Sequence, residues 1–281
     1  MGQKGILHRP YQVPVRARAV PSATASRNPS GTSRVTEHEP RLYLPQPLCA
    51  GERYTLTGDQ HRHISRVLRL KAGAMLTLFD GTGGEYGAVI EDVQRSDCSV
   101  RTAEFRDLDK ESPLPVRLAQ GVGRGERTDY AIQKAVELGV TSIVPLLTRR
   151  GLVRLDAQRA QRRHSHWHGI IVHACQQCGR NRLPELSSVV TLTEWLRGYG
   201  GSNLDLILDP ASTSSFSALE YSGGLITLLV GPEGGLDNQE REAAFAAGFQ
   251  GISLGPRTLR TETAAVAAVT AVQLRWGDLG N

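Results

Sequence analysis

The strongest local indication of the fold is the stretch Leu225-Ile-Thr-Leu-Leu-Val-Gly-Pro-Glu-Gly-Gly235. Residues 225–230 are apolar apart from Thr227, which is typical of a strand buried on both faces of a sheet. Three glycines within the next five residues allow positive φ and let a ligand approach the backbone closely. No Gly-Lys-Ser/Thr follows, so this is not a Walker phosphate loop, nor is it a dinucleotide fingerprint. A ligand-binding loop and an ordinary strand-to-helix turn both remain open.

A second unusual stretch, Leu254-Gly-Pro-Arg-Thr-Leu-Arg-Thr-Glu-Thr-Ala264, follows a strand that we expect over residues 252–254. We expect Thr261 to cap the last helix and Glu262 to lie in its first turn, where negative charge is favoured. Small alanine side chains in this helix, over 262–276, would allow another backbone to pack closely. Arg257 and Arg260 form a positive pair that suits an anionic or RNA partner.

The chain around these loops, beyond Pro115, alternates between strand and helix patterns. Such alternation predicts an α/β fold with a mostly parallel sheet covered on both faces. Ligands of such sheets bind in the loops at the carboxyl ends of the strands, where both glycine-bearing stretches lie. Further strands are expected over 116–120, 142–147 and 205–208, and further helices over 129–138, 156–178 and 238–247.

The part before Pro113 and Pro115 is short and β-like from residue 41 to about 111. A hairpin is predicted, with strands over 75–79 and 86–93 around the turn Asp80-Gly-Thr-Gly-Gly84. A short helix is expected over 59–70. Residues 1–38 are polar, basic and interrupted by proline, so we expect a disordered leader. It is interpreted as a dispensable tail, an over-extended start or a targeting signal.

The composition narrows the class of protein. The 281 residues are 40% hydrophobic and 22% charged, which excludes coiled coil, collagen and a wholly disordered chain. No apolar run reaches the roughly 18 to 20 residues of a membrane helix, so no membrane partner is expected. Four Cys do not make a disulfide scaffold in a chain of this length, and a cytoplasmic location is expected. Most of the +5 net charge lies in residues 1–40, with six basic and two acidic side chains.

Local clusters of arginine therefore matter more than net charge. The stretch from Arg149 to Arg182 contains eight arginines and a single acidic residue, Asp156. Arginine binds phosphate with two hydrogen bonds and stacks on bases, so an RNA surface is one interpretation and a solvated face is the other. With the arginines of the 59–70 helix, two basic surfaces would clamp one nucleic acid.

Two weaker patterns also occur. Cys175 and Cys178 have redox or zinc spacing, but no second cysteine pair completes a structural zinc site. His164, His168 and Cys175 could share a helix face, although a polar face without a metal is the simpler interpretation.

Gly121, Gly123 and Gly125 are spaced like part of a nucleotide motif. We interpret them as a flexible connection that leads into Arg124 and Arg127.

Taken together, these strings resemble the RsmE family, the 16S ribosomal RNA (uracil-N3)-methyltransferases of the SPOUT superfamily. The resemblance runs in order from about residue 41 to 280. It rests on Arg66-Val-Leu-Arg69, Ile132-Gln-Lys-Ala-Val-Glu-Leu-Gly-Val140, Ala174-Cys-Gln-Gln-Cys-Gly-Arg-Asn-Arg-Leu-Pro-Glu185, Val230-Gly-Pro-Glu-Gly-Gly-Leu236, the 254–264 stretch and Gly277-Asp-Leu-Gly280.

The resemblance implies an α/β SPOUT domain with a C-terminal trefoil knot over 113–281, preceded by a small PUA-like β-barrel domain over 39–112. It also implies S-adenosylmethionine as cofactor, 16S ribosomal RNA of the small subunit as partner, and a homodimer formed through the knot region, with no metal.

Roles are also expected for individual residues, and the resemblance implies those of the cofactor-binding set. Arg260 would stabilise the uracil anion and Glu262 would help to take the N3 proton. The RNA-binding set is Arg62, Arg66, Arg69, Arg124, Lys134, Arg150, Arg180 and Arg182. The cofactor-binding set is Leu208, Pro210, Val230, Gly231, Glu233, Gly234, Gly235, Leu254, Gly255, Leu259, Arg260, Thr263 and Ala264.

The sequence departs from the family at Gln176 and Arg149, where the family usually has Glu. Both changes remove negative charge near the arginine cluster, so we expect stronger attraction of phosphate. The alternatives are a SPOUT enzyme that methylates a ribose 2′-oxygen, a non-catalytic RNA-binding protein, and a metal or redox protein built on Cys175 and Cys178.

Overall fold

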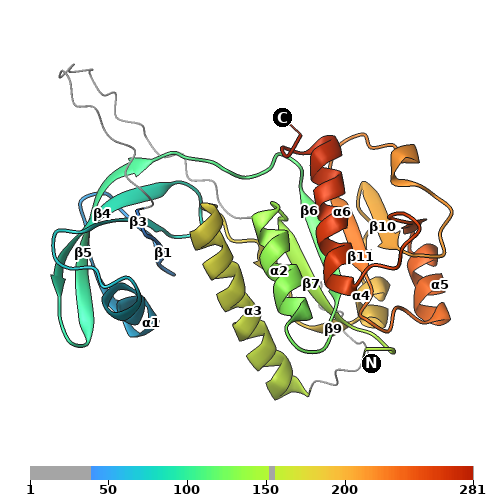
Figure 1. Ribbon diagram of the computed structural model, residues 1–281, viewed down its shortest axis with the longest axis horizontal. Coiled ribbons are helices and arrows are strands. Elements are labelled where there is room, and N and C mark those ends of the chain that lie inside the picture. The colour runs from blue at the N-terminus through green and yellow to red at the C-terminus, as the bar shows by residue number, and fades with distance from the viewer. Residues whose placement is uncertain (1–38, 152–155, 281) are drawn as a thin grey trace, which may run out of the picture. The chain divides into compact units, whose positions relative to one another are not determined.

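The computed structural model describes residues 39–151 and 156–280 (Figure 1). The predicted leader over 1–38 and Arg154 of the basic stretch lie outside the described residues. Among the described residues, no helix is both long and apolar enough to cross a membrane.

The N-terminal part is a mixed five-stranded sheet with the order β1-β3-β4-β5-β2. The predicted hairpin is confirmed, because β3 and β4 pair antiparallel on either side of the glycine-rich turn. Leu56, Leu78, Ile90 and Val100 form part of its core and are all less than 2% exposed. The strands are β1 (Arg41–Tyr43), β2 (Arg53–Thr57), β3 (Met75–Phe79), β4 (Glu85–Val93) and β5 (Asp97–Arg106).

The helix expected over 59–70 is shorter than predicted and changes type. It consists of α1 (Gly58–Arg62) and a π-helical turn, η1 (His63–Val67). Arg69 has a positive φ of 53°, a conformation that does not continue a helix. Ile64 is buried on the sheet side, whereas Arg62, Arg66 and Arg69 are exposed.

The second sheet is entirely parallel and has the order β12-β10-β11-β6-β7-β8, with β9 also paired to β7. The predicted α/β class is confirmed. The last strand, β12 (Gln250–Ile252), begins and ends two residues earlier than the strand expected over 252–254. Leu254 therefore lies in the loop that follows it. The strands are β6 (Val116–Gly121), β7 (Ser142–Leu147), β8 (Glu185–Leu186), β9 (Val190–Thr191), β10 (Leu204–Leu208), β11 (Ile226–Val230) and β12.

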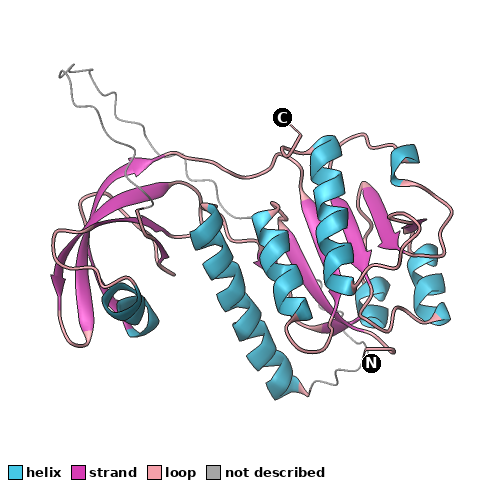
Figure 2. Ribbon diagram, viewed as in Figure 1, coloured by secondary structure: helices cyan, strands magenta, loops and turns pink. Residues whose placement is uncertain are grey.

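Helices cover both faces of this sheet (Figures 1 and 2). Successive strand residues alternate between two cores, as with Leu228 and Leu229 of β11, because side chains of a strand point to opposite faces. The core that contains Leu228 includes residues of α2 (Arg127–Glu137), α3 (Ala157–Cys178) and α6 (Thr261–Trp276). The core that contains Leu229 includes residues of α4 (Leu192–Arg197) and α5 (Asn238–Ala246).

The long helix α3 begins and ends where the sequence predicts. The Asp156 carboxylate accepts a hydrogen bond from the amide nitrogen of Arg159 at 2.7 Å, which satisfies one free donor of the first turn. Gly179 follows the helix with a φ of 86°, the left-handed conformation that terminates many helices.

Candidate functional site

A cleft of about 520 Å³ lies where β10, β11 and β12 end. Three loops line it, which follow Leu208, Val230 and Ile252, and the first turn of α6 closes it with Thr261 and Ala264. Glu233 and Leu259 therefore lie on one shared cleft, as the sequence predicts for the two glycine-bearing stretches.

Thr261 joins two of these loops to a neighbouring strand. Its hydroxyl donates to the carbonyl of Gly231 at 2.6 Å and accepts from the Gln120 amide nitrogen at 3.0 Å. The prediction that Thr261 caps the last helix is wrong, since Arg260 holds the cap position and Thr261 is the first helical residue. The hydroxyl instead fixes the start of α6 against the ends of β11 and β6.

Glu233 fastens the β11 loop to the segment after β6. Its Oε1 atom accepts from the amide nitrogen of Arg124 at 3.0 Å and from the Arg127 guanidinium at 2.8 Å. Partial burial raises the pKa of Glu233, but hydrogen bonds from backbone amides and from Arg127 outweigh it, so the pKa lies below its usual value. The carboxylate is therefore charged at neutral pH, and it holds Arg127 on the cleft.

The three glycines at 121, 123 and 125 are not a flexible connection, so that interpretation is wrong. A Cβ on Gly121 would lie 2.6 Å from Pro232, and one on Gly123 would lie 2.8 Å from both Glu233 carboxylate oxygens. Gly125 has a φ of 63°, which other residues adopt at a cost. The first two glycines are thus needed because the 231–235 loop packs directly on them.

An ion pair that the sequence analysis missed also lines the cleft. Asp209, 8% exposed, pairs with Arg241 of α5, and its other oxygen accepts from the amide nitrogen of Ala211 at 3.0 Å. The signal available for Asp209 was its place directly after an expected strand, at the sheet edge where ligands bind. Nothing in the sequence pointed to Arg241, which comes from the middle of a helix.

Most of the predicted cofactor residues are brought together. Gly234 and Thr263 do not line the cleft, and Gly234 instead packs on Arg150, whose carbonyl oxygen would lie 2.9 Å from an added Cβ. The predicted residues that line the cleft are Leu208, Pro210, Val230, Gly231, Glu233, Gly235, Leu254, Gly255, Leu259, Arg260 and Ala264.

The two predicted catalytic residues lie at the start of α6 but in different settings. Arg260 is exposed and lines the cleft, and its guanidinium has no hydrogen-bond or ion-pair partner in the described part of the chain. Glu262 does not line the cleft. Its Oε2 atom is buried and has no hydrogen-bond partner among residues 39–151 and 156–280.

Arg180, predicted to bind RNA, lies in the interior at 4% exposure. Its guanidinium pairs with Glu111 and donates to the carbonyls of Val136 at 2.8 Å and Val140 at 3.0 Å. The charge of Arg180 is balanced by Glu111, and its guanidinium N–H groups donate to buried acceptors. Arg180 therefore stabilises the fold and is not at the surface where RNA would bind.

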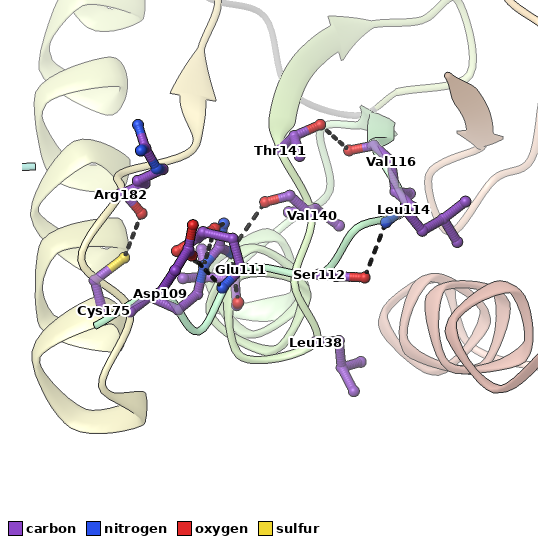
Figure 3. Close-up of polar contacts among 12 residues, drawn as sticks. Asp109, Glu111, Ser112, Leu114, Val116, Leu138, Val140, Thr141, Cys175 and Arg182 are labelled. Carbon is purple, nitrogen blue, oxygen red and sulfur yellow. Dashed lines mark hydrogen bonds and ion pairs between the residues drawn. The ribbon is translucent and has the colours of Figure 1, made fainter. Parts of the chain in front are cut away.

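The other predicted RNA residues remain at the surface. Lys134 forms an ion pair with Glu137 at 2.8 Å, and Arg62 pairs with Asp59. Arg182 is exposed, with its guanidinium against Gly83, and its carbonyl accepts from the Cys175 thiol at 3.7 Å (Figure 3). Arg66, Arg69, Arg124 and Arg150 are exposed.

The two departures from the family pattern have partners of their own. Arg149 contacts the start of α5, with its guanidinium 3.5 Å from Asp237 and its amide nitrogen 2.7 Å from the Glu240 carboxylate. Gln176 accepts a long hydrogen bond of 3.4 Å from the amide nitrogen of Tyr43. The charge of Arg149 is thus partly neutralised by helix α5, which reduces the expected gain in phosphate attraction.

The cysteines give no support to a metal or redox site. Burial raises the pKa of Cys175 to about 12 and also raises that of Cys178, so both thiols are protonated at neutral pH. His164 contacts the carbonyl of Leu186 at 3.2 Å. Within residues 39–151 and 156–280, no group of three or more potential metal ligands occurs.

Comparisons with known proteins agree with this architecture. The family described as RNA methyltransferase domain matches residues 110–273, and the RNA methyltransferase PUA domain matches residues 56–102. Ribosomal RNA small subunit methyltransferase E of Rickettsia conorii is 34% identical, over 83% of this chain and 95% of that protein. The Buchnera aphidicola (Schizaphis graminum) protein of the same name is 31% identical, over 85% of this chain and 98% of that protein.

Solved structures give the same result. Ribosomal RNA small subunit methyltransferase E from Neisseria gonorrhoeae, bound to S-adenosyl methionine, matches with a TM-score of 0.80 and 38% identity, covering 86% of this chain and 100% of that one. A Legionella pneumophila protein in complex with the same cofactor matches with a TM-score of 0.83 and 39% identity, at the same coverage.

Proposed function

This chain belongs to the ribosomal RNA small subunit methyltransferase E family, and we propose that it transfers the methyl group of S-adenosylmethionine to N3 of a uridine in 16S ribosomal RNA. The observation that carries the proposal is the cleft formed by the loops after β10, β11 and β12, in a chain that has two solved relatives bound to this cofactor.

The residues of the cleft fit S-adenosylmethionine. Its volume lies within the range of about 300 to 1,000 Å³ of small-molecule sites. Aliphatic side chains, among them Leu208, Val230 and Leu259, offer an apolar wall to a purine ring, and Asp209 is an acceptor for hydroxyl groups. When bound, S-adenosylmethionine supplies an electrophilic methyl group on a positively charged sulfur.

Arg260 is placed to stabilise the reacting base. Uracil N3 carries a proton that must leave before the nitrogen can attack, and the resulting negative charge spreads to O2 and O4. An unpaired guanidinium on the cleft stabilises that charge, as donors in an oxyanion hole do. N3 is also on the pairing edge of uracil, so the uridine must be unpaired or flipped out of a helix.

Glu262 is the carboxylate that we propose to take the N3 proton, although its side chain does not line the cleft in the free chain. It lies two residues after Arg260 in the first turn of α6, and its buried Oε2 atom has no partner in the described part of the chain. An acceptor left without a donor in a buried position is available to a proton.

The substrate context and the assembly extend this proposal. The RNA is methylated within the small subunit in the cytoplasm, and residues 39–112 and 113–281 act as a PUA-like and a knotted SPOUT domain. The chain forms a homodimer through the knot region. Support comes from Leu274 near the end of α6, which is 55% exposed in the single chain and would be covered by a partner.

Methyl transfer to unmodified small subunits, followed by mass spectrometry of the digested nucleosides, tests the proposal. We expect labelled N3-methyluridine, with turnover reduced by about 100-fold or more in Arg260→Ala. We expect a loss of about 100-fold in Glu262→Gln. Arg197→Ala, an exposed arginine on α4, is the matched control and should keep full turnover. A 2′-O-methylated product would identify a ribose methyltransferase, and full turnover in both variants would remove both roles.

A further inference from the structure

We call the cleft of about 520 Å³ at the ends of β10, β11 and β12 the donor cleft. A second cleft, of about 410 Å³, lies beside it. Five residues line both clefts, namely Pro210, Ser253, Gly255, Arg257 and Thr258. The second cleft also includes the serine-rich loop over 212–215. Nothing in the proposed chemistry at the donor cleft uses this loop.

The chemistry of the second cleft is that of an anion site. Arg257 is exposed and has no ion-pair or hydrogen-bond partner in the described part of the chain. The hydroxyls of Thr213, Ser214 and Thr258 are likewise without hydrogen-bond partners among residues 39–151 and 156–280. None of the described residues that line the cleft is acidic or aromatic. One guanidinium with several free hydroxyls matches the acceptor oxygens of a phosphate.

The serine loop is held in place before any ligand binds. Ser212 donates to the carbonyl of Gly251 at 2.7 Å and accepts from the amide nitrogen of Ser214 at 3.2 Å. The amide nitrogen of Ser253 donates to the carbonyl of Ser214 at 3.2 Å. These bonds tie the loop to β12, so the backbone of the loop is ordered before a ligand binds, which lowers the entropic cost of binding.

Arg275 of α6 anchors the other end of the same loop. It donates to the carbonyls of Phe216 at 2.6 Å and Leu219 at 2.8 Å. Its guanidinium also lies 4.9 Å from the centre of the Trp276 ring, a cation–π contact. The loop is thus anchored to α6 as well as to β12.

We propose that this cleft binds a backbone phosphate of the RNA next to the uridine that is methylated, with Arg257 as the charged ligand. The inference rests on the proposed function, because base and phosphate lie at opposite ends of a nucleotide. When a uracil enters the donor cleft with its pairing edge first, the phosphates of that nucleotide stay outside the cleft. The second cleft adjoins the donor cleft and can receive one of these phosphates. The other anion that could reach Arg257 is the carboxylate of the methyl donor.

The test compares wild type, Arg257→Ala, Arg257→Lys and the control Arg197→Ala. Affinity for an unmodified 16S ribosomal RNA transcript is measured over a series of salt concentrations, and affinity for S-adenosylhomocysteine is measured by calorimetry. For Arg257→Ala we expect RNA affinity to fall by about tenfold or more. The slope of log affinity against log salt should fall by about 0.7. Arg257→Lys should keep the slope, and cofactor affinity should stay within about twofold of wild type in both variants.

Two results would overturn the inference. One is RNA affinity and a salt slope in Arg257→Ala equal to those of Arg197→Ala. The other is a loss of S-adenosylhomocysteine affinity with RNA binding unchanged, which would assign Arg257 to the donor carboxylate. RNA binding is measured without turnover, so the two proposals can fail separately. A wild-type protein that methylates no uridine would refute the proposed function, whereas the role of Arg257 in binding phosphate would still be decided by the RNA affinities.

Discussion

Replacing Gly123 by alanine should disrupt the donor cleft through Glu233, although residue 123 does not line the cleft. The new Cβ would lie 2.8 Å from both carboxylate oxygens, closer than such atoms approach in proteins. Either the carboxylate moves and loses the 3.0 Å bond from Arg124, or the two segments separate. Overpacking costs about 1–3 kcal/mol. A lost hydrogen bond to a charged acceptor costs about 1.5–3 kcal/mol.

These two costs are alternatives, because movement of the carboxylate relieves the clash by breaking its bonds. We therefore expect the free energy of unfolding to fall by about 2 kcal/mol. The ion pair with Arg127 adds little to this, since the Arg127 side chain is 43% exposed. Displacement of the β11 loop should raise the Kd for S-adenosylhomocysteine by about tenfold, which corresponds to about 1.4 kcal/mol of binding.

Urea unfolding and calorimetry on Gly123→Ala, Glu233→Ala and the double variant measure both effects. On the Glu233→Ala background the carboxylate is gone, so Gly123→Ala should cost little there, and the two changes should couple strongly. Gly169→Ala is the control, since that glycine lies in α3 with open space around it and alanine favours helix. An equal cost of Gly123→Ala with and without the Glu233 carboxylate would show that the clash with this carboxylate is not what destabilises the variant.

Three further predictions follow from buried or paired groups. Arg180→Met leaves the charge of Glu111 partly buried without a partner, so we expect about 3–5 kcal/mol less stability in chemical unfolding. The salt slope of RNA binding should not change. Cys175 should resist alkylation at about pH 8 while exposed Cys49 reacts, as peptide mass spectrometry would show. The folded-state pKa of Glu233 is lowered, so its stabilisation is present at neutral pH and is lost as pH falls through that pKa. Unfolding of Glu233→Gln should accordingly depend less on acid than that of wild type.

The sequence was sufficient to predict an element where residues within that element determine its bounds. Helix α3 has a capping carboxylate at Asp156 and a left-handed glycine at 179, and its bounds agree with the prediction. The loop after β11 could be placed at the sheet edge from one apolar run and its glycines. In these places the propensity, the cap and the period of the pattern all indicate the same structure.

Contacts between distant segments could not be predicted from the sequence alone. The need for glycine at position 123 could not be predicted, because Glu233, which leaves no room for a Cβ there, comes 110 residues later in the chain. Arg180 was counted as part of a basic surface because its partner, Glu111, lies 69 residues earlier. A charge count along the chain does not tell which arginines meet an acid in the folded protein. The π-helical turn η1 gave no local signal either.

We infer that the loops after β10, β11 and β12 form one binding site for the methyl donor. Calorimetry of S-adenosylhomocysteine with wild type and with Leu259→Arg, which would fill the cleft with a long charged side chain, measures this binding. We expect saturable binding by wild type and a Kd raised by about 100-fold or more in the variant, a loss of about 2.7 kcal/mol. Equal binding by the two proteins, or no binding by wild type, would contradict it.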